Sequence, residues 1–230
     1  MITFKNWEES SLDLITEIYR RLYEAYGPQS WWPAETWFEV VVGAVLTQNT
    51  AWKNVERAIE NLKRAGLLEP RKLYETNDEF VEMLIKPAGF WKLKARRLKN
   101  LLQKLAEHDF DFYRLRESLT RDELLSVAGI GPETADSILL YAFEQPVFVV
   151  DNYTRRIFTR VGVLNGKENY SQIQSMFQRA VKDIETMKEY HALLVEHAKK
   201  VCKKREPRCD SCALKDLCQT WNKVRSETAV

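Results

Sequence analysis

Glycine and proline are scarce in this chain, with 8 and 7 residues respectively among 230. A β-protein with many strands needs these residues in its turns, so their scarcity favours a fold built from helices. No stretch of 18 consecutive apolar residues occurs, and the first residues lack the basic start and apolar run of a secretion signal. We therefore expect a soluble cytoplasmic protein with no membrane partner.

Cysteine is absent from all but one short segment. The four cysteines are Cys202, Cys209, Cys212 and Cys218. Since none remains elsewhere to bridge distant segments, a disulfide framework is a poor explanation and metal ligation a good one. Four thiolates in so short a loop can hold one metal centre, because closing short loops costs little entropy and soft sulfur suits iron or zinc.

A large excess of charge is also absent, because 35 Lys and Arg oppose 33 Asp and Glu for a net charge of +2. As an average, that balance argues against a polyanion such as DNA as the partner. The basic residues are unevenly placed, however: residues 86–105 contain seven Lys or Arg and no acid, and residues 199–208 contain six against one Glu. We therefore predict a basic surface whose affinity for DNA falls as salt concentration rises.

Apolar residues recur at helical spacing along most of the chain, which predicts an all-α fold. The helices expected from this pattern cover residues 14–25, 37–46, 52–66, 93–105, 122–127, 132–143, 171–184 and 189–200. A further helix contains Ile157 and Val161, with Asp151 as its N-cap. Residues 146–150 have the composition of a strand, but no partner strand is evident, so we expect an extended connector there.

Two short helices joined by a tight turn are predicted in the middle of the chain. Thr120 and Glu123 have the spacing of a capping box at the start of the first helix, and Pro132 suits the first turn of the second. The turn between them consists of Gly129, Ile130 and Gly131. Because glycine lets the backbone turn tightly and expose amide N–H groups at a helix start, this turn is a candidate site for one DNA phosphate.

The spacing of the four cysteines, with six, two and five residues between successive members, resembles the [4Fe-4S] loop of the endonuclease III family of DNA glycosylases. A zinc site usually shows two Cys-x2-Cys pairs, whereas this loop has one. The basic loop residues that match the family are Lys203, Lys204, Arg205 and Arg208. The resemblance implies a structural [4Fe-4S] cluster that presents these cations to DNA phosphates and performs no redox chemistry on the substrate.

With Pro146 and Asp151 further along the chain, the glycine turn resembles the helix-hairpin-helix element with a Gly/Pro-Asp loop that names the wider superfamily. The resemblance extends from about Trp31 to Cys218. It implies that Asp151 is the catalytic residue, whose carboxylate stabilises an oxocarbenium at the sugar C1′ and orients or deprotonates the attacking water. Without that motif, a single Asp at a helix start is usually only a cap.

Bifunctional members of the family use a lysine in the second hairpin helix, whose amine attacks C1′ before the strand is nicked. This sequence has Glu133 at the matching position. A carboxylate cannot form a Schiff base, so we expect a monofunctional glycosylase without abasic-site lyase activity, in which water is the nucleophile. The alternative interpretation of Glu133 is a solvated first-turn residue that the helix dipole stabilises.

Four of the seven tryptophans lie within residues 31–52. This segment resembles the 3-methyladenine glycosylase branch of the superfamily, which implies an aromatic pocket for the extruded base. The residues of that pocket would be Trp31, Trp32, Pro33 and Trp52. Electron-rich rings favour positively charged alkylated purines by about 1–2 kcal/mol of cation–π stacking when desolvated. The same resemblance implies that Gln48 fills the gap left by the flipped nucleotide and that Lys94 contacts a phosphate.

The expected architecture has two helical domains. Residues 30–143 form the first and carry the hairpin, while residues 1–29 and 144–230 form a discontinuous iron–sulfur domain. Double-stranded DNA with a damaged base would bind in the cleft between them to a monomeric, nucleoid-associated enzyme that needs no small-molecule cofactor. The predicted reaction is hydrolysis of the N-glycosidic bond of alkylated purines in base excision repair. Three alternatives stay open: a thymine or uracil mismatch glycosylase, a bifunctional glycosylase and lyase, and a DNA-damage binding protein without turnover.

Overall fold

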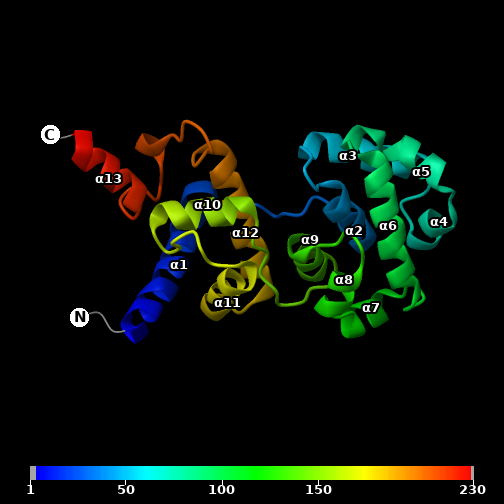
Figure 1. Cartoon of the computed structure of the whole chain (residues 1–230), viewed down its shortest axis with the longest axis horizontal. Coiled ribbons are helices and arrows are strands. Elements are labelled where there is room, and N and C mark those ends of the chain that lie inside the picture. Colours follow the sequence, from blue (N-terminus) through cyan, green and yellow to red (C-terminus); the bar gives the residue numbers. More distant parts are fainter. Residues whose placement is uncertain (1–3, 229–230) are drawn as a thin grey trace. The chain divides into compact units, whose positions relative to one another are not determined.

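The computed structural model describes residues 4–228 and contains no β-strand within that range, which confirms the all-α prediction. The chain divides into two compact units (Figure 1). The hairpin unit is Trp32–Gln145, and the cluster unit comprises Met1–Trp31 together with Pro146–Val230. Among the described residues, no helix combines the length and apolar character that a membrane span requires.

The hairpin unit is built around α2, which is apolar on almost every side. Its helices are α2 (Trp37–Leu46), α3 (Trp52–Arg64), α4 (Pro70–Glu75), α5 (Asp78–Ile85), α6 (Trp91–Ala106), α7 (Phe112–Ser118), α8 (Arg121–Ser126) and α9 (Pro132–Ser137), with a 3-10 turn η1 (Lys86–Ala88) and a π-helical turn η2 (Ile138–Ala142). Nine of the 10 residues of α2 are buried. Helix α2 packs on α3, α6 and η2, and α5 packs on α3 and α6. The continuous apolar run of α2 is therefore a buried helix, as predicted.

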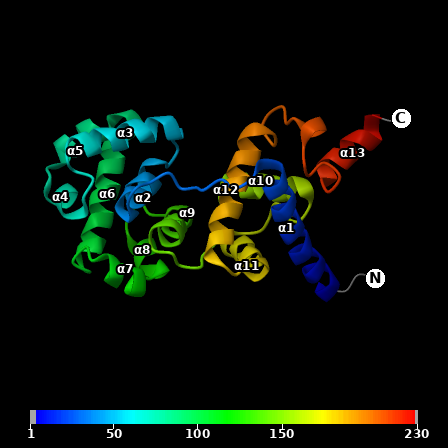
Figure 2. The same cartoon turned by 180° about the vertical axis from the view of Figure 1, so that it is seen from behind.

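The cluster unit gathers helices from both ends of the chain. They are α1 (Phe4–Tyr26), α10 (Asn152–Val161), α11 (Tyr170–Ala180), α12 (Ile184–Lys200) and α13 (Gln219–Thr228), with a 3-10 turn η3 (Cys209–Ser211). Helix α1 packs on α11 and α12, and α10 packs on α12 and α13 (Figure 2). The Phe148 and Phe177 rings stack with centroids 4.2 Å apart, and the buried Tyr190 hydroxyl donates to the Ile15 carbonyl at 2.6 Å. The first contact joins the connector at residues 146–150 to α11, and the second joins α12 to α1.

The structure differs from the sequence prediction mainly in short helices. Helices α4, α5 and α7 have six to eight residues, which is too short for helical periodicity to show. Side-chain caps start all three, since Glu69 accepts from the backbone N–H of Arg71, Asn77 from that of Phe80 and Asp111 from that of Arg114. The second hairpin helix, expected to run to about residue 143, is α-helical only to Ser137 and continues as the π-helical turn η2. Residues 146–150 form neither a helix nor a strand, which agrees with the prediction of a connector there.

Candidate active site

Asp151 is the N-cap of α10, which confirms the structural part of the prediction. Its Oδ1 accepts from Thr154, from the backbone N–H at 2.7 Å and from the hydroxyl at 2.9 Å. Its Oδ2 lies 3.6 Å from Nε2 of His191 on α12. Asp151 is only 7% exposed and His191 only 4%. Each carboxylate oxygen therefore faces a different partner in a site that is largely shielded from water.

Burial of Asp151 acts to raise the pKa of its carboxyl group, because desolvation disfavours the charged form. The interactions that it receives from His191 and Thr154 outweigh this desolvation, so its pKa lies below the ordinary value of an aspartate. Asp151 is therefore an anion at neutral pH. A buried anion is well suited to stabilise a developing positive charge, because little water screens the interaction.

Three aromatic side chains of the hairpin unit form what we call the aromatic cluster: Trp32, Trp52 and Tyr141. The Trp32 ring meets Trp52 edge to face, with centroids 5.6 Å apart, and lies 5.3 Å from the Tyr141 ring. Gly43 in α2 permits this packing, because a Cβ at that position would lie 3.3 Å from the indole of Trp32. Trp32 and Trp52 were expected to share a pocket. Tyr141 was not, since it lies in a buried apolar run.

Trp31, although adjacent to Trp32 in sequence, has different neighbours. Its ring lies 5.6 Å from the ring of His191, both within the cluster unit. Trp31 therefore borders the surroundings of Asp151, whereas Trp32 belongs to the aromatic cluster. Pro33, the remaining residue of the predicted base pocket, is exposed.

The predicted hairpin is present, with α8 and α9 joined at residues 127–131 and the capping box of Thr120 and Glu123 formed. Gly129 has a φ of +96°, a conformation that favours glycine. A Cβ at this position would also lie 2.4 Å from Cγ of Arg97, so the close approach of the Arg97 side chain requires glycine as well. The Ile130 side chain is 5% exposed and anchors the turn. Glu133 is an exposed residue in the first turn of α9.

Gln48 lies against this hairpin. Its amide nitrogen donates to the carbonyl of Gly129 at 3.2 Å and to the hydroxyl of Thr134 at 3.0 Å, and its amide oxygen accepts from the guanidinium of Arg97. Insertion of Gln48 into a DNA gap would require these hydrogen bonds to break. The role of Arg97 was missed, because its contacts lie more than thirty residues away in sequence on both sides.

Lys94 is placed differently from its prediction as a phosphate contact. Its side chain is 1% exposed, and its ammonium donates to the carbonyls of Leu46 at 2.7 Å and Ala88 at 2.8 Å and to the hydroxyl of Thr50 at 2.6 Å. Burial, together with the positive charge of Arg97, lowers the pKa of Lys94 to about 8. The prediction is therefore wrong for this residue, because its charge is used to join the end of α2 to the start of α6.

We expect Lys94→Met to destabilise the protein by about 2–4 kcal/mol, because it leaves buried carbonyl groups without their donor while preserving most of the side-chain volume. The measurement is the free energy of unfolding by denaturant titration. Lys92→Met is the matched control, since Lys92 is exposed on the same helix and should change stability by less than about 0.5 kcal/mol. Equal stability of the two variants would contradict the structural role of Lys94.

The remaining basic residues of 86–105 are only partly available for DNA. The Lys99 ammonium donates to the carbonyls of Leu73 and Tyr74 at 3.0 and 2.8 Å, and Lys104 pairs with Glu107 at 2.7 Å. The exposed basic side chains of this stretch are Lys86, Lys92 and Arg96. Fewer basic side chains of this stretch are therefore available to DNA than the number of its Lys and Arg residues suggests.

Phe90 is an exposed aromatic residue for which the sequence predicted no role. Its backbone has a left-handed φ of +48°, it immediately precedes α6, and its side chain is 68% exposed. An aromatic ring held outward near basic residues can stack on a nucleobase. The signal in the sequence is the preceding Gly89, which marks a turn just before a basic helix.

The four predicted metal-ligating cysteines come together around one cavity of about 230 Å³. Leu214 donates its backbone N–H to Sγ of Cys212 at 3.4 Å, and Arg160 on α10 donates to Sγ of Cys202 at 3.3 Å. Arg160 also donates to the carbonyl of Lys203 at 2.8 Å. The loop is thus supported by hydrogen bonds to sulfur and to its backbone.

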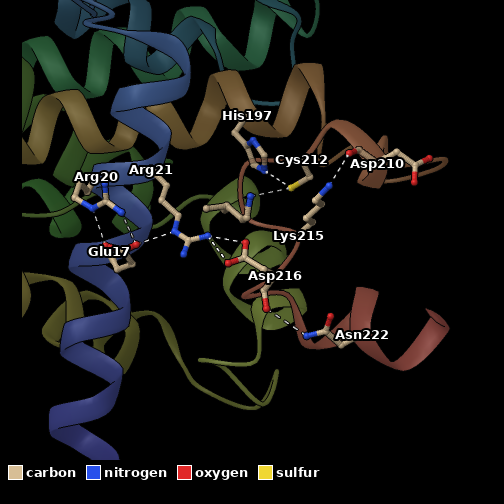
Figure 3. A network of polar contacts seen from close by, with 10 residues as sticks. Glu17, Arg20, Arg21, His197, Asp210, Cys212, Lys215, Asp216 and Asn222 are labelled. Atoms are coloured by element: carbon tan, nitrogen blue, oxygen red, sulfur yellow. Dashed lines mark hydrogen bonds and ion pairs between the residues drawn. The ribbon is translucent and has the colours of Figure 1, made fainter. Parts of the chain in front are cut away.

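Two polar links join α1 to this loop, and Figure 3 shows the first of them together with the His197–Cys212 contact of the second. Arg21 binds the carboxylate of Asp216 at 2.6 Å. On the other side of the loop, Nε2 of the buried His197 lies 3.6 Å from Sγ of Cys212, and its Nδ1 lies 2.8 Å from the hydroxyl of Tyr26. The amino-terminal helix therefore helps to fix the position of the cysteine loop.

Four cysteine side chains line this cavity, and thiolates are ligands that both zinc and iron–sulfur clusters use. Among the described residues, no group of three or more His, Cys, Asp or Glu side chains is placed to hold a metal ion. Hydrogen bonds from N–H groups to sulfur are also typical of the protein environment of iron–sulfur clusters.

The basic residues of the loop lie at its surface to different degrees. Lys204, Arg205 and Arg208 are exposed and Lys203 is half-buried. These four residues keep the exposure that a contact with DNA phosphates would require.

Residues 42–183 match the model of the family described as HhH-GPD superfamily base excision DNA repair protein. The matched range contains the hairpin turn and Asp151, while the cysteine loop lies beyond it. The chain belongs to the HhH-GPD superfamily of base excision DNA repair proteins, which confirms the predicted family.

Individual relatives agree with this assignment. The chain is 50% identical over 217 residues to "Putative DNA repair glycosylase MJ1434" of Methanocaldococcus jannaschii, covering 92% of this chain and 98% of that protein. It is 30% identical over 185 residues to endonuclease III of Sulfolobus acidocaldarius, covering 80% and 82%. Among solved structures, H. pylori 3-methyladenine DNA glycosylase bound to 1,N6-ethenoadenine matches with a TM-score of 0.74 and 29% identity, covering 83% of this chain and 97% of that chain.

Proposed function

We propose that this protein is a monofunctional DNA glycosylase that hydrolyses the N-glycosidic bond of alkylated purines such as 3-methyladenine in double-stranded DNA. The observation that carries the proposal is the buried, ionised carboxylate of Asp151 at the start of α10. Family membership supports the coarser assignment to base excision repair. The similarity to a 3-methyladenine glycosylase supports the substrate class.

The proposed reaction needs one anion and one water molecule. As the N-glycosidic bond breaks, its electron pair leaves with the base, and positive charge develops on C1′ and the sugar ring oxygen. The Asp151 carboxylate stabilises this charge and accepts the proton of the water whose oxygen attacks C1′. The products are the free base and an abasic site. Because an alkylated purine already carries positive charge, it leaves without a general acid.

The aromatic cluster supports the choice of an alkylated purine. An extruded base must be held by stacking, and electron-rich indole and phenol rings favour a cationic base over a neutral one. Trp32, Trp52 and Tyr141 supply three such rings in the hairpin unit. Trp31 supplies another beside His191.

Contacts to the phosphate backbone are proposed for both units. In the hairpin unit, the backbone of Gly129, Ile130 and Gly131 precedes α9 and can bind one phosphate. In the cluster unit, the basic residues of the cysteine loop can bind others. These contacts predict an affinity for duplex DNA that falls with salt concentration.

We assign a [4Fe-4S] cluster to the four cysteines, since their arrangement around one cavity suits it. The ligands would be Cys202, Cys209, Cys212 and Cys218. The bound cluster would supply a covalent framework that folds the loop. The residues of this chain then hold the loop in place, Arg160 from α10 and Arg21 from α1.

Because Glu133 stands where bifunctional relatives have a lysine, we test the proposal by asking whether the protein cleaves the DNA strand as well as releasing the base. We expect the protein to convert methylated duplex DNA into abasic DNA whose strand breaks only after alkali treatment. Borohydride should trap no protein–DNA adduct, because Glu133 offers no amine for a Schiff base. Strand breaks that form without alkali, together with a trapped adduct, would show that another amine attacks C1′ and would contradict the monofunctional mechanism.

A further inference from the structure

His191 is a buried titratable residue that the proposed reaction does not use directly. It lies on α12 within a run of buried residues from Tyr190 to Val195, and its side chain faces Asp151 across 3.6 Å. Nothing in the spacing of the sequence joins these two residues, which lie 40 positions apart. Their pairing appears only when α10 packs on α12.

The two oxygens of Asp151 have unequal surroundings. Oδ1 is committed to the cap of α10, where it accepts two hydrogen bonds from Thr154. Oδ2 is the oxygen that faces His191. Both oxygens move together when the carboxylate turns about its Cβ–Cγ bond, so a contact at Oδ2 adds a second restraint on the orientation that the Thr154 hydrogen bonds favour.

The imidazole of His191 is itself held in place. It is 4% exposed, and the Trp31 ring lies 5.6 Å from it, inclined by 57°. Because the surrounding packing leaves the ring little room to turn, Nε2 keeps its direction toward Oδ2. A contact of 3.6 Å is longer than a hydrogen bond, but such contacts commonly shorten when a substrate binds.

We infer that His191 is a positioning residue that directs Oδ2 of Asp151 toward the reacting sugar. This inference rests on the proposed function, since it assigns the orientation of the proposed catalytic carboxylate. Thr154 at one oxygen and His191 at the other fix the plane of the carboxylate before the substrate arrives. The effect on rate can be large, because a displacement of about 1 Å at a reacting group can cost on the order of 100-fold.

The test compares His191→Gln with His191→Met. Glutamine can place an N–H donor near the position of Nε2, whereas methionine has a similar length and no donor. On methylated duplex DNA, His191→Met should lower the single-turnover rate of base release about 10- to 100-fold, and His191→Gln should retain most of the rate. The Kd for a duplex carrying a stable abasic-site analogue should be unchanged in both. Adding His191→Met to Asp151→Asn should cause little further loss, because the two residues act as one unit.

The outcomes separate this inference from the proposed function. If Asp151→Asn is as active as the wild type, the proposed function fails. If Asp151→Asn is inactive while His191→Met retains the wild-type rate, only the positioning role is overturned. The positioning role is also overturned if both His191 variants lose rate, melting temperature and duplex affinity alike, since that pattern indicates a purely structural role.

Discussion

Asp151→Asn is expected to lower the single-turnover rate of base release from methylated duplex DNA about 1,000-fold. The substitution removes the anion that stabilises positive charge at C1′ and the group that accepts a proton from water. Each effect alone is typically worth about 100-fold or more, and the two are not additive in free energy because one group supplies both. Asparagine is also a good N-cap, so its side-chain oxygen can still accept from Thr154. The melting temperature and the affinity for duplex DNA should therefore stay close to those of the wild type.

The matched control for this prediction is Asp183→Asn. Asp183 is the N-cap of α12 in the same unit and accepts from the backbone N–H of Thr186 at 2.8 Å, but it is exposed. The same chemical change there should leave the rate of base release unaltered. An Asp151→Asn protein as fast as Asp183→Asn would contradict a catalytic role for Asp151.

The second large effect is expected at the cysteine loop. Cys212→Ser should abolish most of the visible absorption of the purified protein and most of its bound iron and sulfide, because it removes one of four ligands of the proposed cluster. It should also lower the melting temperature, since binding of a structural metal centre contributes to the free energy of folding. Absorption spectra, iron and sulfide analysis and thermal unfolding measure these changes.

Ser211→Ala provides the control, because Ser211 is an exposed neighbour of Cys212 in the same loop. It should leave the absorption spectrum and the metal content unchanged. A colourless wild-type protein that contains zinc would contradict the iron–sulfur assignment. So would a Cys212→Ser protein that keeps the spectrum and iron content of the wild type.

The features that the sequence predicted well are local ones. The capping box of Thr120 and Glu123 and the cap formed by Asp151 each join residues three positions apart. The glycine turn of the hairpin depends on a few adjacent residues as well. Such features can be read from a sequence because the backbone of one or two turns determines which groups meet.

The features that the sequence did not predict depend on contacts between distant residues. His191 meets Asp151 across 40 positions, and Tyr141 meets Trp32 across more than 100. Lys94 is a residue whose predicted role was wrong for the same reason. Its place in a basic stretch predicted a surface charge, yet the packing of α2 and α6 buries its ammonium among carbonyl groups. The number of basic residues in a segment does not determine whether their charged groups are buried or exposed.

Base-release profiling on a panel of duplexes measures whether the protein releases alkylated purines. The panel carries 3-methyladenine, N7-methylguanine, G·T and G·U mismatches, or oxidised pyrimidines, and free bases are separated and quantified by chromatography. We predict release of the methylated purines by the wild type and none by Asp151→Asn. Release of thymine or uracil from the mismatches, with the methylated purines left in the DNA, would contradict the account, as would tight binding of every duplex with no free base at all.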